Sequence, residues 1–231
     1  MELHYIPDSG FVARGGKGPR RDAPRDWIVW HFTHVSNLQA IVSQGRLVCG
    51  SAARPTRDVA NAAVKARRAE RIVDPDDDYP TSYVNDHVPF YIAAKSPMLY
   101  VMHRGHESYR EGCEPLIFLG AALGDIIDSG LTWCVSDSNA ATQYVEFSRD
   151  EATLGSFVDF DLLLQRDWYN TADDTDRKSR RAAEVLVLGQ VPLDLISIVV
   201  AKSEDMLTAA RGMFQSVGGT REYRVVPGLY Y

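Results

Sequence analysis

The chain has 231 residues and 45% hydrophobic content, enough to bury a sizeable core as one large domain or two small ones. No apolar run approaches the roughly 18 to 20 residues that span a bilayer, and the start of the chain has no basic region followed by an apolar core, so we expect a cytoplasmic protein with no membrane partner. Three cysteines without paired ligand spacing argue against a disulfide framework and a zinc site, and a formal net charge of -6 argues against a uniformly basic nucleic-acid binder.

The beginning of the chain predicts an irregular segment followed by a strand. Residues 1–26 are expected to be an irregular lead-in, because 10–26 contain a glycine-rich stretch and no hydrophobic periodicity. The apolar run 27–30 is too short for a helix and rich in strand-forming residues. It therefore predicts a strand that delivers His31 and Thr33 at its end and on one face.

Two helices and an acidic loop are expected next. Ser36 or Asn37 can cap a helix that continues to about residue 44 and is ended by Gly45. Residues 56–73 predict a longer helix with an apolar face and an arginine-rich face, and an acidic loop follows it.

The remaining elements are short strands and one further helix. Strands are expected at 88–92, 116–119, 133–135, 184–188, 195–201 and 221–226, and a helix at 203–216. The order of these elements predicts an α+β fold in a single domain, 1–231, without the regular alternation of a Rossmann domain.

Glu184 is the most unusual polar residue of this pattern. It opens the apolar strand 184–188, where an ionised carboxylate is costly unless it is wetted at the strand end, paired, or used in chemistry. Together with His31 and Thr33 at the end of the first strand, it indicates a cleft between strands. A His103-x-x-His106 group lacks a third distant ligand, so we expect no metal.

Four stretches of the chain carry a resemblance to a known family. They are Trp-His-Phe-Thr-His at 30–34, Val-Pro-Phe-Tyr-Ile-Ala-Ala-Lys-Ser-Pro-Met-Leu-Tyr at 88–100, Ser-Asp-Ser-Asn-Ala-Ala at 136–141 and Arg-Arg-Ala-Ala-Glu-Val-Leu-Val at 180–187. In this order they resemble the DarT toxins of the ADP-ribosyltransferase superfamily, which modify thymine bases in single-stranded DNA. The resemblance implies an ADP-ribosyltransferase-like fold with a central split of short, mostly antiparallel strands and surrounding helices.

The resemblance also implies residue roles on the NAD side. His31, Phe32 and Thr33 match the segment that contacts the ribose hydroxyls and the nicotinamide amide of NAD, and Asn37 is carried as a weaker contact. Taken alone, each of the histidines is more often a packing or capping residue than a ligand. Either Tyr91 or Ser96 faces the nicotinamide, and the sequence does not choose between them.

Two residues are expected to be catalytic. Glu184 matches the family carboxylate that binds the ribose and stabilises the positive charge as nicotinamide leaves. The resemblance places a catalytic arginine in the helix expected at 56–73, and its spacing favours Arg68 over the adjacent Arg67. An arginine stays protonated and can stabilise the anion that forms when thymine N3 loses its proton.

The acceptor is expected to contact the polar loop 165–178 that precedes Glu184. Trp168 and Tyr169 can stack on unpaired bases, and the basic run that ends at Arg181 can hold phosphates. The alternative for both aromatic residues is that they fix the loop to the core.

The sequence as a whole predicts a toxin that transfers ADP-ribose from NAD to thymidine in single-stranded DNA, with a DarG-type macrodomain antitoxin as its partner. The alternatives are a transferase acting on RNA or protein, an NAD glycohydrolase, and a nucleotide-binding module that has lost catalysis.

Overall fold

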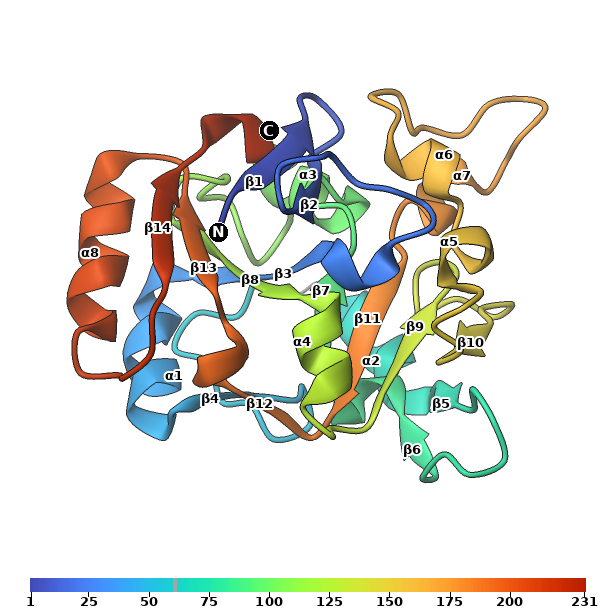
Figure 1. The fold of residues 1–231 in the computed structure, drawn as a ribbon, viewed down its shortest axis with the longest axis horizontal. Coiled ribbons are helices and arrows are strands. Elements are labelled where there is room, and N and C mark those ends of the chain that lie inside the picture. Colours follow the sequence, from blue (N-terminus) through green and yellow to red (C-terminus); the bar gives the residue numbers. More distant parts are fainter. Residues whose placement is uncertain (60–61) are drawn as a thin grey trace.

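An eight-stranded mixed sheet forms the centre of the computed structural model, which describes residues 1–59 and 62–231 (Figure 1). The strand order is β10-β9-β11-β7-β3-β8-β13-β14, and all neighbours are antiparallel except β13 and β14. The strands are β3 (Ile28–His34), β7 (His87–Tyr91), β8 (Leu116–Ala122), β9 (Trp133–Ser136), β10 (Phe147–Ser148), β11 (Glu184–Leu188), β13 (Ile198–Ala201) and β14 (Glu222–Val225). The predicted α+β fold with short, mostly antiparallel strands is confirmed.

In the described part of the chain, three two-stranded sheets and eight short α-helices surround this sheet. The small sheets pair β1 (Leu3–Ile6) with β2 (Phe11–Arg14), β4 (Arg46–Val48) with β12 (Gln190–Pro192), and β5 (Ile72–Val73) with β6 (Ser82–Tyr83). The α-helices are α1 (Leu38–Gln44), α2 (Ala62–Glu70), α3 (Pro97–Arg104), α4 (Leu123–Asp128), α5 (Leu154–Phe157), α6 (Phe160–Leu163), α7 (Arg177–Arg180) and α8 (Glu204–Phe214). Among the described residues, no helix has the length and apolar character that crossing a membrane requires.

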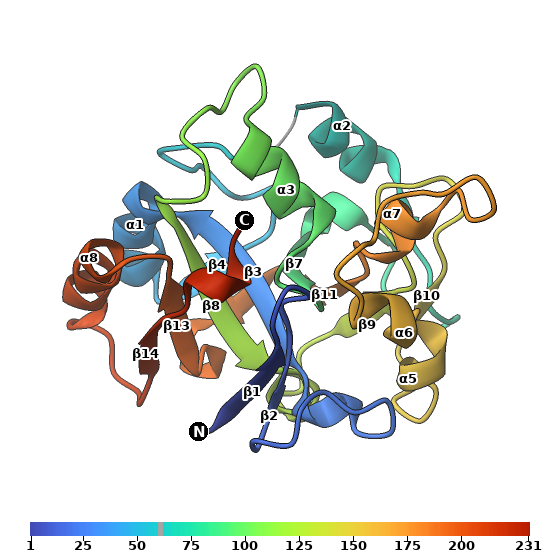
Figure 2. The same ribbon diagram turned by 90° about the horizontal axis from the view of Figure 1, so that it is seen from above.

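The two faces of the sheet are covered by different helices. Val29 of β3 packs in the same core cluster as residues of α1 and α8, which lie side by side (Figure 1, Figure 2). The alternate residues Ile28 and Trp30 pack in a second cluster with Leu99 and Met102 of α3. This alternation places His31 and Thr33 of β3 on the same side as Val29, as the sequence predicted.

The sheet separates between β3 and β7. Within the described residues these strands pair only at Trp30 and Tyr91, whereas β3 pairs with β8 along its whole length. Pro89 of β7 has no backbone N–H and cannot donate to a neighbouring strand, so it cannot extend the pairing. The split leaves the end of β3, from His31 onward, and the adjacent edge of β7 available to a cavity.

The prediction of an irregular lead-in over 1–26 was wrong for its first part. Leu3–Ile6 and Phe11–Arg14 form an antiparallel hairpin, turned by Asp8 and Gly10 in left-handed backbone conformations. Phe11 is fully buried, and its ring lies 5.5 Å from that of Trp27. The short strands escaped prediction because only the contact with the domain core buries them.

The helix predicted over 56–73 was too long at both ends. The described part of the helix is α2, Ala62–Glu70, while 56–59 are loop and Ile72–Val73 form β5; residues 60–61 lie outside the described part of the chain. The helices predicted at 36–44 and 203–216 are confirmed as α1 and α8. Gly45 ends α1 with a φ of 66°, a conformation that favours glycine.

Gly120 marks the closest packing on β8 and gives a stability prediction. A Cβ at this position would lie 2.7 Å from both Trp30 and Ile198, which are fully buried. We expect Gly120→Ala to lower the free energy of unfolding by about 1 to 3 kcal/mol, measured by urea denaturation. The control is Gly212→Ala on the exposed side of α8, where no atom lies within 4 Å and the substitution should stabilise the helix. Equal effects of the two variants would contradict the packing argument.

Candidate active site

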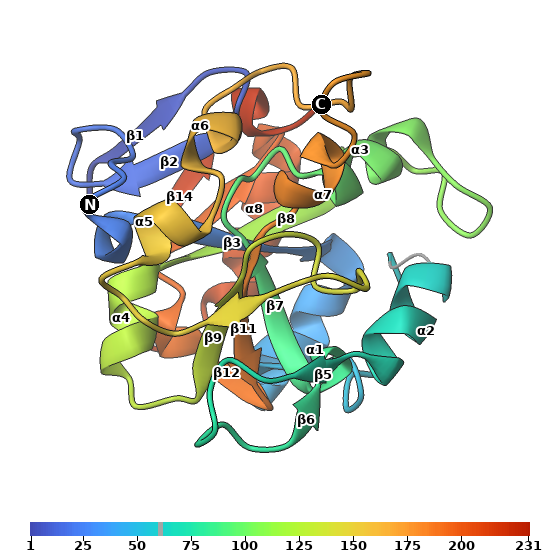
Figure 3. The same cartoon turned by 90° about the vertical axis from the view of Figure 1, so that its right-hand side faces the viewer.

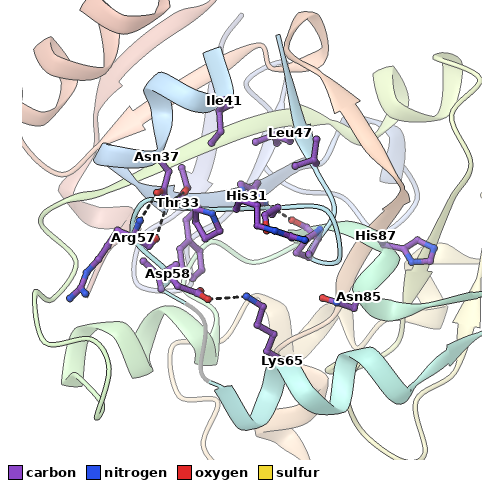
Figure 4. Close-up of a pocket in the computed structure, with 18 of the residues that line it drawn as sticks. His31, Thr33, Asn37, Ile41, Leu47, Arg57, Asp58, Lys65, Asn85 and His87 are labelled. Atoms are coloured by element: carbon purple, nitrogen blue, oxygen red, sulfur yellow. Dashed lines mark hydrogen bonds and ion pairs between the residues drawn. The ribbon is translucent and has the colours of Figure 1, made fainter. Parts of the chain in front are cut away.

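A cavity of about 250 Å³ lies beside the split between β3 and β7. Its lining comes from β3, α1, α2, β7 and the connections between them, so segments far apart in the sequence meet there. Figure 4 shows His31, Thr33 and Asn37 on one side of the cavity and Lys65 of α2 on another. Of the residues predicted for NAD binding, His31, Phe32, Thr33 and Asn37 all line this cavity.

The strongest electrostatic feature beside the cavity is an ion pair between Arg68 and Glu184. Nη1 of Arg68 lies 3.0 and 2.9 Å from the two carboxylate oxygens of Glu184, whose side chain is only 1% exposed. The backbone N–H of Ala140 also approaches the carboxylate, at 3.4 Å. A buried carboxylate requires such partners, because an uncompensated charge inside a protein is strongly destabilising. Arg68 thus supplies from α2 the charge that Glu184 on β11 needs.

Arg68 also separates Glu184 from the cavity. The cavity lining includes Arg68 but not Glu184, so the carboxylate is screened by the guanidinium. The second terminal nitrogen of Arg68, Nη2, is buried and finds no hydrogen-bond acceptor among the described residues. A free donor at the wall of a cavity suits an oxygen of a bound substrate. The adjacent Arg67 is exposed and does not line the cavity, which distinguishes the two arginines.

His31 is held as a neutral imidazole. Its Nδ1 donates a hydrogen bond of 3.0 Å to the carbonyl oxygen of Pro89, which can only accept, so Nε2 carries no proton in the neutral ring. Burial lowers the pKa of His31, and the positive charge of Arg68 lowers it further. His31 can therefore offer Nε2 as an acceptor to a hydroxyl or amide group.

Asn37 connects Thr33 of β3 to the loop between β4 and α2. The side-chain amide of Asn37 donates to Thr33 Oγ1 at 3.1 Å and to the carbonyl oxygen of Arg57 at 2.8 Å. Its amide oxygen accepts the backbone N–H of Arg57 at 2.8 Å (Figure 4). Because both polar groups of Asn37 are engaged within the protein, the geometry favours a positioning role for Asn37.

The structure distinguishes between Tyr91 and Ser96. Tyr91 lines the cavity and stacks on Phe32, with ring centroids 5.9 Å apart and planes 15° from parallel. Burial and the negative charge of Glu184 raise the pKa of Tyr91, which keeps its phenol neutral. Ser96 is fully buried, and its hydroxyl accepts from the backbone N–H of Leu99 as the N-cap of α3. Of the two, only Tyr91 faces the cavity.

Sequence reasoning missed three cations that line the cavity, Arg54, Arg57 and Lys65. Arg57 is paired with Glu111 and Lys65 with Asp58, whereas Arg54 donates only to backbone carbonyl oxygens among the described residues. Arg54 thus has the least neutralised charge of the three. The segment around it has no periodicity and belongs to a loop, so no sequence pattern pointed to it.

The prediction that Arg181 holds phosphates was wrong. Its guanidinium is fully buried and donates to five backbone carbonyl oxygens, those of Ser9, Lys95, Leu162, Leu163 and Gln165. Burial lowers the pKa of Arg181 to about 10, which leaves it protonated at neutral pH. Arg181 therefore joins the β1-β2 hairpin, the segment after β7 and the end of α6, and its donors are used internally. The prediction failed because a run of basic residues in the sequence does not show which of its side chains are buried.

Trp168 and Tyr169 lie outside the cavity that contains His31 and Arg68. They line a second cavity formed by the loop before α7, α3 and Tyr231. Trp168 is half-buried, and its Nε1 donates to the hydroxyl of Tyr231 at 2.9 Å, whereas Tyr169 is 63% exposed. Trp168 thus fixes the loop, and Tyr169 presents an exposed ring.

The described residues contain no group of three or more side chains arranged to hold a metal ion.

Comparisons with known proteins identify what this arrangement resembles. A family model described as DarT, an ssDNA thymidine ADP-ribosyltransferase, matches residues 30–231. A DNA ADP-ribosyl transferase of Mycobacterium tuberculosis is 56% identical over 231 residues, which is 100% of both chains. The solved structure of Thermus sp. 2.9 DarT in complex with ADP-ribosylated ssDNA is similar with a TM-score of 0.79 at 23% identity, covering 88% of this chain and 96% of that one. Its complex with NAD+ gives 0.75 at 24% identity, covering 92% and 99%.

The structural role of Arg181 is testable by substitution. We expect Arg181→Ala to lower the free energy of unfolding by about 3 kcal/mol or more, because it leaves buried carbonyl oxygens without a donor. Chemical denaturation measures the change, and Lys178→Ala, at an exposed lysine of the same run, is the matched control with little expected effect. An Arg181→Ala protein of unchanged stability and selectively weakened DNA binding would instead support a phosphate contact.

Proposed function

The chain belongs to the DarT family of single-stranded DNA thymidine ADP-ribosyltransferases, and from that premise we propose how its residues divide the transfer. The enzyme moves ADP-ribose from NAD+ to thymidine bases and releases nicotinamide. The observation that carries the proposed roles is the buried ion pair of Arg68 and Glu184 beside the cavity. The family description and the name of the mycobacterial relative both favour DNA over RNA, protein or water as the acceptor.

Glu184 acts on the ribose of NAD+. When the bond between C1′ and nicotinamide breaks, its electron pair leaves with the nicotinamide and positive charge develops on the ribose. A carboxylate held at the start of β11 can accept a hydrogen bond from a ribose hydroxyl and stabilise the positive charge on the ribose. The exclusion of water from the site strengthens this electrostatic stabilisation. Because Arg68 screens Glu184 in this structure, we infer that Arg68 shifts from one carboxylate oxygen as the ribose enters.

The nicotinamide and its ribose are held by the β3 end of the cavity. His31 offers Nε2 as an acceptor, and the stacked rings of Phe32 and Tyr91 provide a flat apolar wall for the nicotinamide ring. Thr33 presents a hydroxyl on the same face as His31, with its orientation set by Asn37. Arg54 is the cation best placed to meet the diphosphate, since its charge is not paired with a described carboxylate.

Arg68 acts on the acceptor. Thymine N3 bonds to C1′ as nicotinamide leaves with the electron pair of the broken bond, and the N3 proton passes to solvent water. The negative charge that builds on the base during this step needs a permanent cation nearby. An arginine guanidinium is a permanent cation, and Nη2 of Arg68 has no partner among the described residues. The same guanidinium thus orders Glu184 through Nη1 and has Nη2 available for the base.

The biological setting follows from the product. A bulky ADP-ribose on thymine N3 removes the base-pairing edge, so modified template strands block replication. We infer a toxin role in the cytoplasm, together with a macrodomain antitoxin of the DarG type that removes the ADP-ribose. The chain acts in this proposal as one domain, 1–231, because the β1-β2 hairpin shares its core with the central sheet.

The assigned roles can be separated with mass spectrometry of synthetic single-stranded oligonucleotides after incubation with NAD+. The wild type should add one ADP-ribose to strands that contain thymine and none to matched strands without it. Glu184→Gln should reduce both transfer and NAD+ consumption by about 100- to 1,000-fold, because charge stabilisation at the ribose is lost. Arg68→Ala should reduce transfer by a similar factor while slower NAD+ hydrolysis continues.

Arg67→Ala is the matched control for Arg68→Ala, since it removes an exposed neighbouring arginine of the same helix. It should retain transfer within about twofold. Circular dichroism of each variant checks the fold. A Glu184→Gln enzyme with normal turnover, or equal losses in the two arginine variants, would contradict the roles assigned to Glu184 and Arg68.

The toxin role predicts a growth phenotype. Induced expression of the wild type in a bacterial host should arrest DNA synthesis, measured by incorporation of a labelled nucleoside, whereas Glu184→Gln should not. Co-expression of an active macrodomain hydrolase should restore synthesis, and a macrodomain inactivated in its ADP-ribose pocket should not. Arrest that persists despite removal of ADP-ribose from the DNA would count against this mechanism of toxicity.

A further inference from the structure

The end of β9 and the turn after it contact Glu184 through groups that the transfer roles above do not use. β9 lies beside β11 in the sheet (Figure 3), and their backbone ladder ends at the pair of Val135 and Val185. The next residue of β9 is Ser136, the first residue of the stretch 136–141 that carries part of the family resemblance. We propose that Ser136 is a positioning residue for the transfer, which fixes the main chain of Glu184 and the turn that holds one oxygen of its carboxylate.

The hydroxyl of Ser136 continues the contact between the two strands where the ladder stops. It accepts the backbone N–H of Glu184 at 3.1 Å and donates to the carbonyl oxygen of Ser138 at 2.7 Å. Ser136 is fully buried and does not line the cavity that contains Arg68, so it cannot touch a substrate there. Its effect on the reaction therefore has to pass through Glu184.

The turn after β9 brings a backbone donor to the carboxylate. The N–H of Ala140, which is fully buried, meets Oε1 of Glu184 at 3.4 Å. Asn139 holds this turn, because its backbone N–H donates to the carbonyl oxygen of Ser179 and its amide oxygen accepts the N–H of Ala141, both at 2.9 Å. The turn is thus tied to α7, and it presents one N–H to one carboxylate oxygen.

The two oxygens of the Glu184 carboxylate therefore differ in their partners. Oε1 accepts from both Arg68 Nη1 and the N–H of Ala140, whereas Oε2 accepts only from Arg68 among the described residues. When Arg68 shifts as the ribose enters, Oε1 keeps its backbone donor and Oε2 is left without a partner. Oε2 is then the oxygen that accepts the ribose hydroxyl. This inference rests on the transfer function proposed above and adds the residues that orient its carboxylate.

The orientation of this carboxylate matters because it acts on a charge that develops only as nicotinamide leaves. A preorganised group needs no rearrangement at that moment, and a displacement of about 1 Å can cost about 100-fold in rate. Ser136→Ala removes the acceptor for the N–H of Glu184 and the donor for the carbonyl oxygen of Ser138, so the strand end and the turn both lose a fixed position. The groups that line the NAD+ cavity are unchanged in this variant.

Steady-state kinetics with NAD+ and a thymine oligonucleotide measure the role of Ser136. Ser136→Ala should lower kcat by about 10- to 100-fold and change KM for NAD+ by less than about twofold. NAD+ consumption without DNA should fall by the same factor as transfer, because Glu184 acts on the ribose and not on the acceptor.

The matched control is Ser9→Ala, at a second fully buried serine that makes the same kinds of hydrogen bond away from the site. The hydroxyl of Ser9 accepts the backbone N–H of Phe11 and donates to the carbonyl oxygen of Ile6. In chemical denaturation this variant should lose about as much stability as Ser136→Ala, because each leaves the same kinds of backbone group without a partner. Its kcat should stay within about twofold of the wild type.

A double-mutant cycle tests whether Ser136 acts through Glu184. If it does, adding Ser136→Ala to Glu184→Gln should lower kcat by no more than about a further twofold. A serine that only stabilised the fold would cost the same factor in both backgrounds. Ser136→Cys has nearly the same volume and a weak donor and acceptor, so it can replace Ser136→Ala in the cycle, with a smaller loss, if the alanine variant does not fold.

The contact of the Ala140 N–H is tested by replacing Ala140 with lactic acid. This replacement exchanges the N–H for an ester oxygen and keeps the methyl group. It should lower kcat about tenfold at an unchanged KM for NAD+, as expected for loss of one hydrogen bond to a charged group. The same exchange at Ala141, whose N–H donates to Asn139 and not to Glu184, should keep kcat within about twofold.

The outcomes separate this inference from the proposed function. If Glu184→Gln loses transfer but Ser136→Ala keeps the wild-type kcat, or costs the same factor in both backgrounds, the positioning role is refuted and the role of Glu184 stands. A Ser136→Ala enzyme that consumes NAD+ normally but transfers poorly also refutes it, because the defect then lies on the DNA side. Wild-type kcat after the exchange at Ala140 overturns the assignment of the two oxygens. Normal turnover of Glu184→Gln overturns both proposals.

Discussion

The buried carboxylate of Glu184 is the constraint on which the site depends. An ionised carboxylate at the start of a central strand is stable only with a cation beside it, and Arg68 provides this cation from a position 116 residues earlier in the chain. The ion pair ties α2 to β11. Residues of α2 line one side of the cavity, where Figure 4 shows Lys65. In the roles proposed for Arg68 and Glu184, the interaction that stabilises the fold is also the one placed at the substrate.

The split sheet gives this pair access to a substrate. Continuous pairing between β3 and β7 would satisfy their backbone groups and leave no cavity, but the two strands meet only at Trp30 and Tyr91 among the described residues. Pro89 cannot donate to β3, and its carbonyl oxygen instead accepts from His31. One proline therefore contributes both to opening the sheet and to fixing the tautomer of the histidine beside the opening.

The basic residues near Glu184 show how an acidic protein can act on DNA. Arg181 donates its hydrogen bonds to backbone carbonyl oxygens, and Arg180 forms ion pairs with aspartates. Much of the basic run before Glu184 therefore has a structural role within the protein. The cations of the two cavities that have no carboxylate partner among the described residues are few and local, Arg54 in one cavity and Arg166 and Lys178 in the other. Local pairing, and not net charge, thus decides where a polyanion can bind.

The sequence by itself determined the elements whose signals are local. Strand-forming runs gave β3 and β11, a glycine at the right position ended α1, and the motif order indicated the family and the set of His31, Thr33, Arg68 and Glu184. Only the tertiary structure decided which polar groups are buried. The structure buries Arg181, places Tyr91 at the cavity and packs the hairpin residue Phe11 into the core. It also makes α2 shorter than the helix predicted over 56–73. Burial and the choice of partners arise from contacts between segments that sequence patterns do not connect.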